Sequence, residues 1–73
     1  MDRTATDAAI RVFLREVQLR LEKSLGIARA AEACAEAGQF EQAVEIALDI
    51  EQPISESARL LDAICLLNRL APE

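Results

Sequence analysis

The chain has 73 residues, a formal net charge of −5 and no histidine. This length allows a single domain over residues 1–73 with a small core, because a domain of this size buries only about 60% of its unfolded surface. Without histidine the chain lacks the commonest general base and metal ligand. No Cys-x-x-Cys pair, glycine-rich phosphate loop or nucleophile elbow occurs. We therefore expect a protein with no enzymatic activity, no catalytic residues, no metal and no cofactor.

The two cysteines and the apolar runs indicate a cellular setting. Cys34 and Cys65 are dispersed and no signal peptide precedes them, which is typical of a reduced, cytoplasmic protein with buried thiols. The longest apolar runs fall far short of the roughly 20 residues that a membrane span requires. We therefore expect a soluble cytoplasmic protein without membrane association.

The first helix is predicted over residues 6–24. Thr4 followed three residues later by Asp7 fits a capping pattern before this helix. Apolar residues then recur at spacings of three and four from Ile10 to Leu25, which keeps them on one helix face. Ser24-Leu25-Gly26 weakens the helix, because glycine costs about 1 kcal/mol relative to alanine in a helix interior. We expect a turn at this point.

Three more helices are predicted after that turn. An alanine-rich helix covers residues 27–37 and ends at Gly38, which can adopt the left-handed conformation of a helix C-cap. A third helix covers residues 40–51 and stops before Pro53; the fourth covers residues 54–70. The expected fold class is all-α, with four short helices in two hairpins, forming either an α-solenoid fragment or a small helical bundle.

An internal repeat supports the hairpin arrangement. A shift of thirty residues places Ala28–Ala33 over Ala58–Ala63, with Ala, Arg and Ala identical and Glu opposite Asp. The same shift places Gly38 over Asn68, and both residue types tolerate a left-handed backbone. This pattern predicts a repeating helical hairpin of about thirty residues.

Residues 30–47 resemble a tetratricopeptide-type (TPR) repeat. Small residues, a helix-ending glycine, an aromatic residue and a terminal proline occur in the order typical of that family, at Ala31, Gly38, Phe40, Ala43 and Pro53. The proline arrives about two residues early, and Ile27 and Cys34 stand where large aromatics are expected. The resemblance implies hairpin packing through these five residues and a role as a protein-binding adaptor, scaffold or chaperone. Small TPR-like co-chaperones of type III secretion are a further alternative of similar size.

The fourth predicted helix is apolar around most of its circumference, and such a helix must be buried nearly all round. A terminal repeat of a monomeric solenoid should instead present a polar outer face. Val12 and Leu19, seven residues apart, form a second apolar line on the side of the first helix opposite its main apolar face. We therefore expect a partner interface, most simply a homodimer or a small helical partner. Its residues are Val12, Leu19, Leu60, Ile64, Leu67 and Leu70.

Charge is distributed unevenly between the two parts of the chain. Residues 1–29 carry six cations and four anions, whereas residues 30–73 carry two cations and nine anions. This asymmetry could steer the basic first helix onto the acidic part of a second copy. A nucleic-acid-associated regulator that uses the basic first helix, with Arg11, Arg15, Arg20 and Lys23, is an alternative. The acidic residues among these cations and the lack of surface aromatics make a nucleic-acid partner the weaker expectation.

Overall fold

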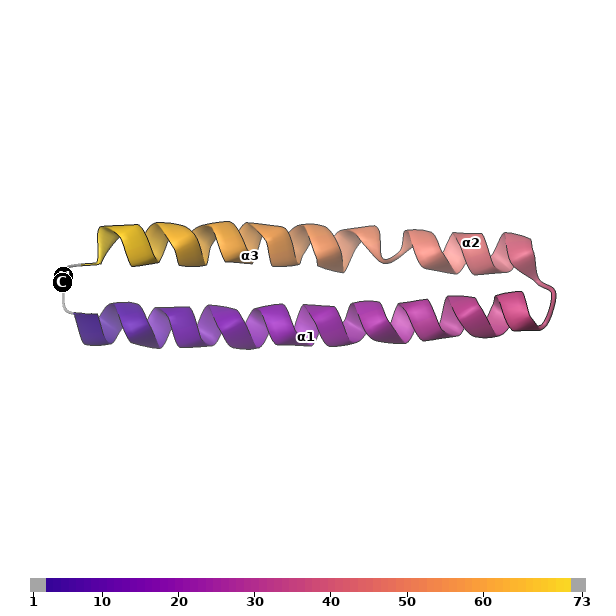
Figure 1. Ribbon diagram of the computed structural model, residues 1–73, viewed down its shortest axis with the longest axis horizontal. Helices are drawn as coiled ribbons and strands as arrows, with labels where there is room; N and C mark the ends of the chain where they lie inside the picture. Colours follow the sequence, from indigo (N-terminus) through magenta and orange to yellow (C-terminus); the bar gives the residue numbers. More distant parts are fainter. Residues whose placement is uncertain (1–2, 72–73) are drawn as a thin grey trace.

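The computed structural model describes residues 3–71, which form three α-helices. The helices are α1 (Arg3–Glu36), α2 (Phe40–Leu48) and α3 (Glu51–Leu70). Helix α1 forms one arm of a long hairpin, and α2 and α3 follow one another along it as the antiparallel second arm (Figure 1). The all-α fold class is confirmed. The expectation of four short helices in two hairpins is wrong. The first two predicted helices form one continuous helix, so residues 3–71 make a single hairpin (Figure 1) and the predicted thirty-residue hairpin does not recur.

Helix α1 passes through Gly26 without a turn, in contrast to the predicted break at residues 24–26. The cost of a glycine in a helix interior, about 1 kcal/mol, is small beside the packing that a turn would lose on both sides of it. The Ser24 hydroxyl also donates a hydrogen bond of 3.0 Å to the carbonyl of Arg20, so this polar side chain is satisfied within the helix. The helix begins at Arg3, one residue before the predicted capping Thr4.

The turn after α1 confirms the prediction that Gly38 ends a helix. Gly38 has a φ of 80°, a conformation that residues with a Cβ rarely adopt. The amide of Gly38 donates to the carbonyl of Ala35 at 2.9 Å, and the amide of Gln39 donates to the carbonyl of Cys34 at 2.9 Å. This pair of bonds is a Schellman motif, and it reverses the chain direction within a few residues.

A short break separates α2 from α3 because Pro53 stands in the first turn of α3. A proline ring clashes with the carbonyl four residues earlier, which here belongs to Asp49, but it is tolerated in a first helical turn. The third and fourth predicted helices are thus seen with shifted bounds: α2 ends at Leu48 rather than at residue 51, and α3 begins at Glu51 rather than at residue 54.

The two arms meet along a line of residues that we call the seam. On α1, successive seam residues are alternately four and three residues apart, which is a heptad pattern. The α1 residues of the seam are Thr6, Ile10, Phe13, Val17, Arg20, Ser24, Ile27, Ala31 and Cys34. The second arm alternates in the same way, with Ala43, Ile46, Ile50, Pro53, Ser57, Leu60, Ile64, Leu67 and Ala71. Every seam residue is buried or partly buried.

The hairpin is an extended rod with a thin core. Its Cα atoms span 55 × 14 × 11 Å and have a radius of gyration of 16.9 Å, whereas a compact chain of this length has a radius of about 11 Å. Within the described residues, the hydrophobic side chains classed as buried are Val17, Ala31 and Ala43. Burial inside one chain is therefore small for a sequence that is 52% hydrophobic.

Candidate protein-binding faces

A two-helix rod has two broad faces, one on each side of its seam. In a heptad arrangement the positions flanking the seam on one side of α1 meet the equivalent positions of the antiparallel arm. We call one side the apolar face because large hydrophobic residues flank the seam on both arms. Those residues are Leu14, Leu21 and Leu25 on α1, Phe40 and Val44 on α2, and Ile54 and Leu61 on α3, all exposed.

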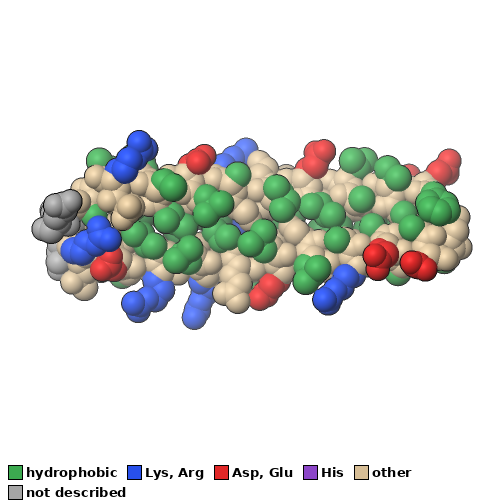
Figure 2. Space-filling model, in the orientation of Figure 1, with side chains coloured by type: hydrophobic (Ala, Val, Ile, Leu, Met, Phe, Trp, Pro, Cys, Tyr) green, Lys and Arg blue, Asp and Glu red, His purple; other side chains and the backbone are tan. Residues whose placement is uncertain are grey.

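Figure 2 shows one broad face of the rod, where hydrophobic side chains gather along the middle between charged side chains at the edges. At one end of the rod, the terminal end, α1 begins and α3 ends (Figure 1). There, Arg3 Nε lies 3.0 Å from Asp7 Oδ1, and Arg3 also donates to Asn68 Oδ1 at 3.5 Å. Asp7 and Asn68 occupy the same heptad position as Leu14 and Leu61 on their respective arms. Because Arg3 contacts both Asp7 and Asn68, the row of residues that contains Leu14 on α1 and the row that contains Leu61 on α3 lie on the same side of the seam.

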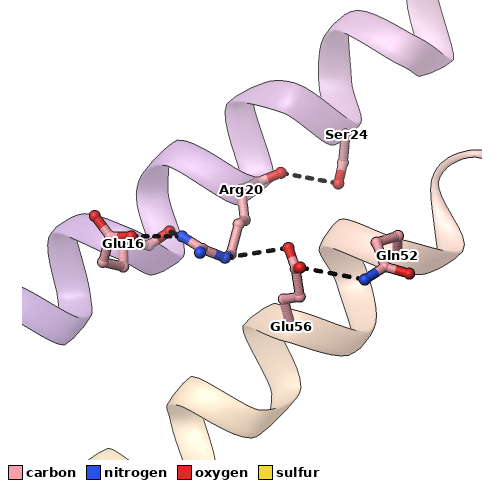
Figure 3. Close-up of polar contacts among 5 residues, drawn as sticks. All are labelled: Glu16, Arg20, Ser24, Gln52 and Glu56. Carbon is pink, nitrogen blue, oxygen red and sulfur yellow. Dashed lines mark hydrogen bonds and ion pairs between the residues drawn. The ribbon is translucent and has the colours of Figure 1, made fainter.

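The opposite side, the mixed face, is polar at its centre. Arg20 donates to Glu16 Oε1 at 2.8 Å, and its Nε lies 3.3 Å from Glu56 Oε1 on the other arm (Figure 3). Gln52 donates to the second oxygen of Glu56 at 3.3 Å. The hydrogen bond to Glu16, with the charges of Glu16 and Glu56, raises the pKa of Arg20 above its ordinary value. Arg20 therefore stays charged and links the arms at mid-length.

The residues predicted to form a partner interface divide into two groups. Leu60, Ile64 and Leu67 lie in the seam and are partly buried against α1 of their own chain. Val12, Leu19 and Leu70 are exposed on the mixed face, where Leu66 joins them toward the terminal end. The structure therefore does not bring the six residues together on one outer surface.

Four of the five residues predicted for hairpin packing lie in the seam or in the turn. Ala31, Ala43 and Pro53 are buried in the seam, and Gly38 forms the turn. Phe40 is the exception: it is 66% exposed, so the expectation that it packs within the hairpin is wrong. Near the turn, the α1 residues that are at least partly buried are small: Ala31, Cys34 and Ala35.

A hollow lies on α2 near the hairpin end of the rod, the end at which Gly38 turns the chain. It is lined by Phe40 and Val44 together with Glu41 and Glu45. The two glutamates are exposed, as expected for solvated carboxylates. The patch is open, and its two apolar side chains beside two carboxylates suit a partner side chain that combines an aliphatic stem with a positive charge.

The sequence interpretation missed the apolar face. Leu14, Leu21 and Leu25 are part of the apolar face predicted for the first helix together with Ile10 and Val17, whereas the structure leaves these three leucines about half exposed. The signal that could have found this face is the strict alternation of four and three through Val17, Arg20 and Ser24, which places the polar pair in the seam and the leucines beside it.

The described residues offer little reactive chemistry. Cys34 is a partly buried free thiol, but Cys65 is exposed, in contrast to the expectation that both are buried. Within residues 3–71, His, Cys, Asp and Glu side chains form no cluster that could hold a metal ion. In the same range, no helix combines the length and hydropathy needed to cross a bilayer.

Exposed area gives the scale of these surfaces. The accessible surface is 5530 Å², whereas a compact monomer of 8.0 kDa exposes about 4,500 Å². The excess of about 1,000 Å² is close to the roughly 800 Å² that each partner contributes to a standard protein–protein interface. The rod thus exposes enough additional surface for a stable association.

Comparison of the chain with protein families, with curated proteins and with solved structures found no match.

Proposed function

We propose that this protein is a non-enzymatic protein–protein interaction module that self-associates through its exposed apolar surface. The observation that carries this proposal is the row of large hydrophobic residues along both arms of one face. Burial of apolar surface contributes about 25 cal/mol per Å², so a patch of several hundred Å² gives a strong drive toward association.

The thin core supports the same conclusion. An isolated pair of helices with few buried side chains gains little from packing, and small domains commonly compensate by oligomerisation. Association would complete the burial that the hairpin lacks. Folding and association should then be coupled, and the melting temperature should rise with protein concentration.

Sedimentation velocity of the purified chain between 1 and 100 μM (about the range of ordinary affinities) tests this proposal. We expect a species of about twice the 8.0 kDa monomer mass, with helicity that falls on dilution. A stable, fully helical monomer throughout that range would contradict self-association.

An adaptor, scaffold or chaperone role would use the remaining apolar residues of the mixed face. Val12, Leu19, Leu66 and Leu70 cluster toward the terminal end there and could hold a helical client. The TPR-like origin of the hairpin and a type III secretion co-chaperone role stay predictions. The nucleic-acid alternative has less support, because Arg20 is engaged by Glu16 and Glu56 at the seam.

A further inference from the structure

The charges along the rod indicate how two copies would be oriented. In the described chain, the terminal half (residues 3–19 and 58–71) carries five cations and three anions. The hairpin half (residues 20–57) carries three cations and eight anions. The rod is thus positive toward its terminal end and negative toward its hairpin end, and two parallel copies would place like charges together.

Resting on the proposed function, we propose that the occupant of the apolar face is a second copy in antiparallel orientation, with the terminal end of each rod over the hairpin end of the other. A two-fold axis in the interface and across the rod produces this arrangement. It places α1 against α1 of the second copy and α3 against α3, which completes an antiparallel four-helix bundle.

The size of the face fits this occupant. The broad side of the rod spans about 55 by 14 Å, comparable with the roughly 800 Å² per partner of a standard interface. A second copy offers a surface of the same length and the same apolar character.

The apolar-face residues of α1 indicate the position of the two-fold axis along the rod. Leu21 is near the middle of α1 (Arg3–Glu36), with Leu14 seven residues before it and Ala28 seven residues after it. With the axis beside Leu21, the two Leu21 side chains meet each other, and Leu14 meets Ala28 of the second copy. A large residue then faces a small one on either side of the centre, which favours close packing.

The same axis pairs opposite charges at the rim of the apolar face. Arg11 lies ten residues before Leu21, and Glu32 lies eleven residues after it, at the same heptad position. Each Arg11 would therefore lie beside Glu32 of the second copy, offset by about one residue, or roughly 1.5 Å along the helix. Within one chain these two residues are about 31 Å apart, too far to interact.

A charge-swap cycle tests this pairing. Arg11→Glu alone and Glu32→Arg alone should each weaken the dimer about three- to tenfold, because each creates two like-charge contacts in an exposed rim. The double variant Arg11→Glu/Glu32→Arg should restore the wild-type dissociation constant at low salt. Since the two sites cannot interact within a chain, restoration requires antiparallel contact. Purely additive losses would overturn the proposed orientation.

A distance measurement gives an independent test in a chain that need not be destabilised. Cys34→Ala, Cys65→Ser and Gln39→Cys allow one spin label at the hairpin end of each copy. Antiparallel pairing should separate the two labels by nearly the 55 Å length of the rod. Parallel pairing would bring them within about 10 to 25 Å.

The outcomes separate this inference from the proposed function. A dimer with a short label distance would overturn the antiparallel orientation and leave self-association intact. A wild-type chain that is monomeric at all concentrations would overturn both. A dimer with the long distance and a restored double variant would support both.

Discussion

The two broad faces of the rod contain matched residues in unlike surroundings. Leu21 on the apolar face is 48% exposed and Leu19 on the mixed face is 50% exposed, yet the first lies in an apolar stripe shared by both arms. On the mixed face, Arg20, Glu16 and Glu56 interrupt any such stripe at mid-length. Exposed leucines on the two faces thus have similar fractional exposure, and the proposed binding surface differs from the mixed face in its continuity along both arms.

The largest expected effect comes from a matched pair of substitutions on α3, one on each face. Leu61→Glu and Leu66→Glu change residues that are each 49% exposed on opposite faces of α3. We expect Leu61→Glu to weaken self-association about 100-fold, equivalent to about 3 kcal/mol, because it buries an unpaired carboxylate. The matched variant Leu66→Glu should retain the dimer. Sedimentation equilibrium measures both, and equal effects of the two variants would remove the distinction between the faces.

A smaller effect is expected where the apolar face is lined by alanine. Ala28→Glu places a carboxylate on that face, whereas Ala33→Glu places one on the mixed face of the same helix. Both positions are exposed in the hairpin. We expect about tenfold weakening of the dimer for Ala28→Glu and little change for Ala33→Glu. Analytical ultracentrifugation checks this, and a greater loss for Ala33→Glu would assign the contact to the other face.

On the mixed face, Gly26 gives a stabilising change. A Cβ added at Gly26 meets no atom within 4 Å, and the residue lies within α1. We expect Gly26→Ala to raise the free energy of unfolding by about 0.5–1 kcal/mol without altering the oligomeric state. Thermal melts at fixed concentration measure this. A loss of stability would mean that something packs against Gly26.

The smallest effect concerns the polar centre of the mixed face. Glu56→Gln removes the charge that links α3 to Arg20 across the seam. Partly exposed ion pairs contribute about 0.2–1 kcal/mol, so we expect a loss of that order, decreasing at high salt. Urea unfolding at two salt concentrations checks it. A loss of several kcal/mol would show that this cluster controls the fold far more than its exposure indicates.

Local signals in the sequence predicted the turn at Gly38 and the break near Pro53, but not the continuity of α1. Gly38 and Pro53 act through steric rules that need no tertiary context, and both occupy the expected kind of position. The sequence wrongly predicts a turn at Gly26. The small loss of helix stability at this glycine is offset by packing on both sides of it, and that packing exists only in the complete hairpin. A helix breaker is decisive when sterics forbid the helix and weak when it only lowers propensity.

The candidate surface was harder to predict for a physical reason. Leu14 and Leu21 have the helical spacing of core residues, and in a complete bundle they would be core. Only the antiparallel register, set by seam residues such as Arg20 and Ser57, shows that one chain leaves them uncovered. Periodicity identifies which side of a helix is buried, but it does not say whether the same chain supplies the cover.

Sedimentation equilibrium of Leu21→Glu beside Leu19→Glu at one concentration shows whether a second copy covers the apolar face. We expect the wild type and Leu19→Glu both to sediment at about twice the 8.0 kDa monomer mass, and Leu21→Glu to be monomeric. A dimeric Leu21→Glu, or a monomeric Leu19→Glu, would contradict this expectation.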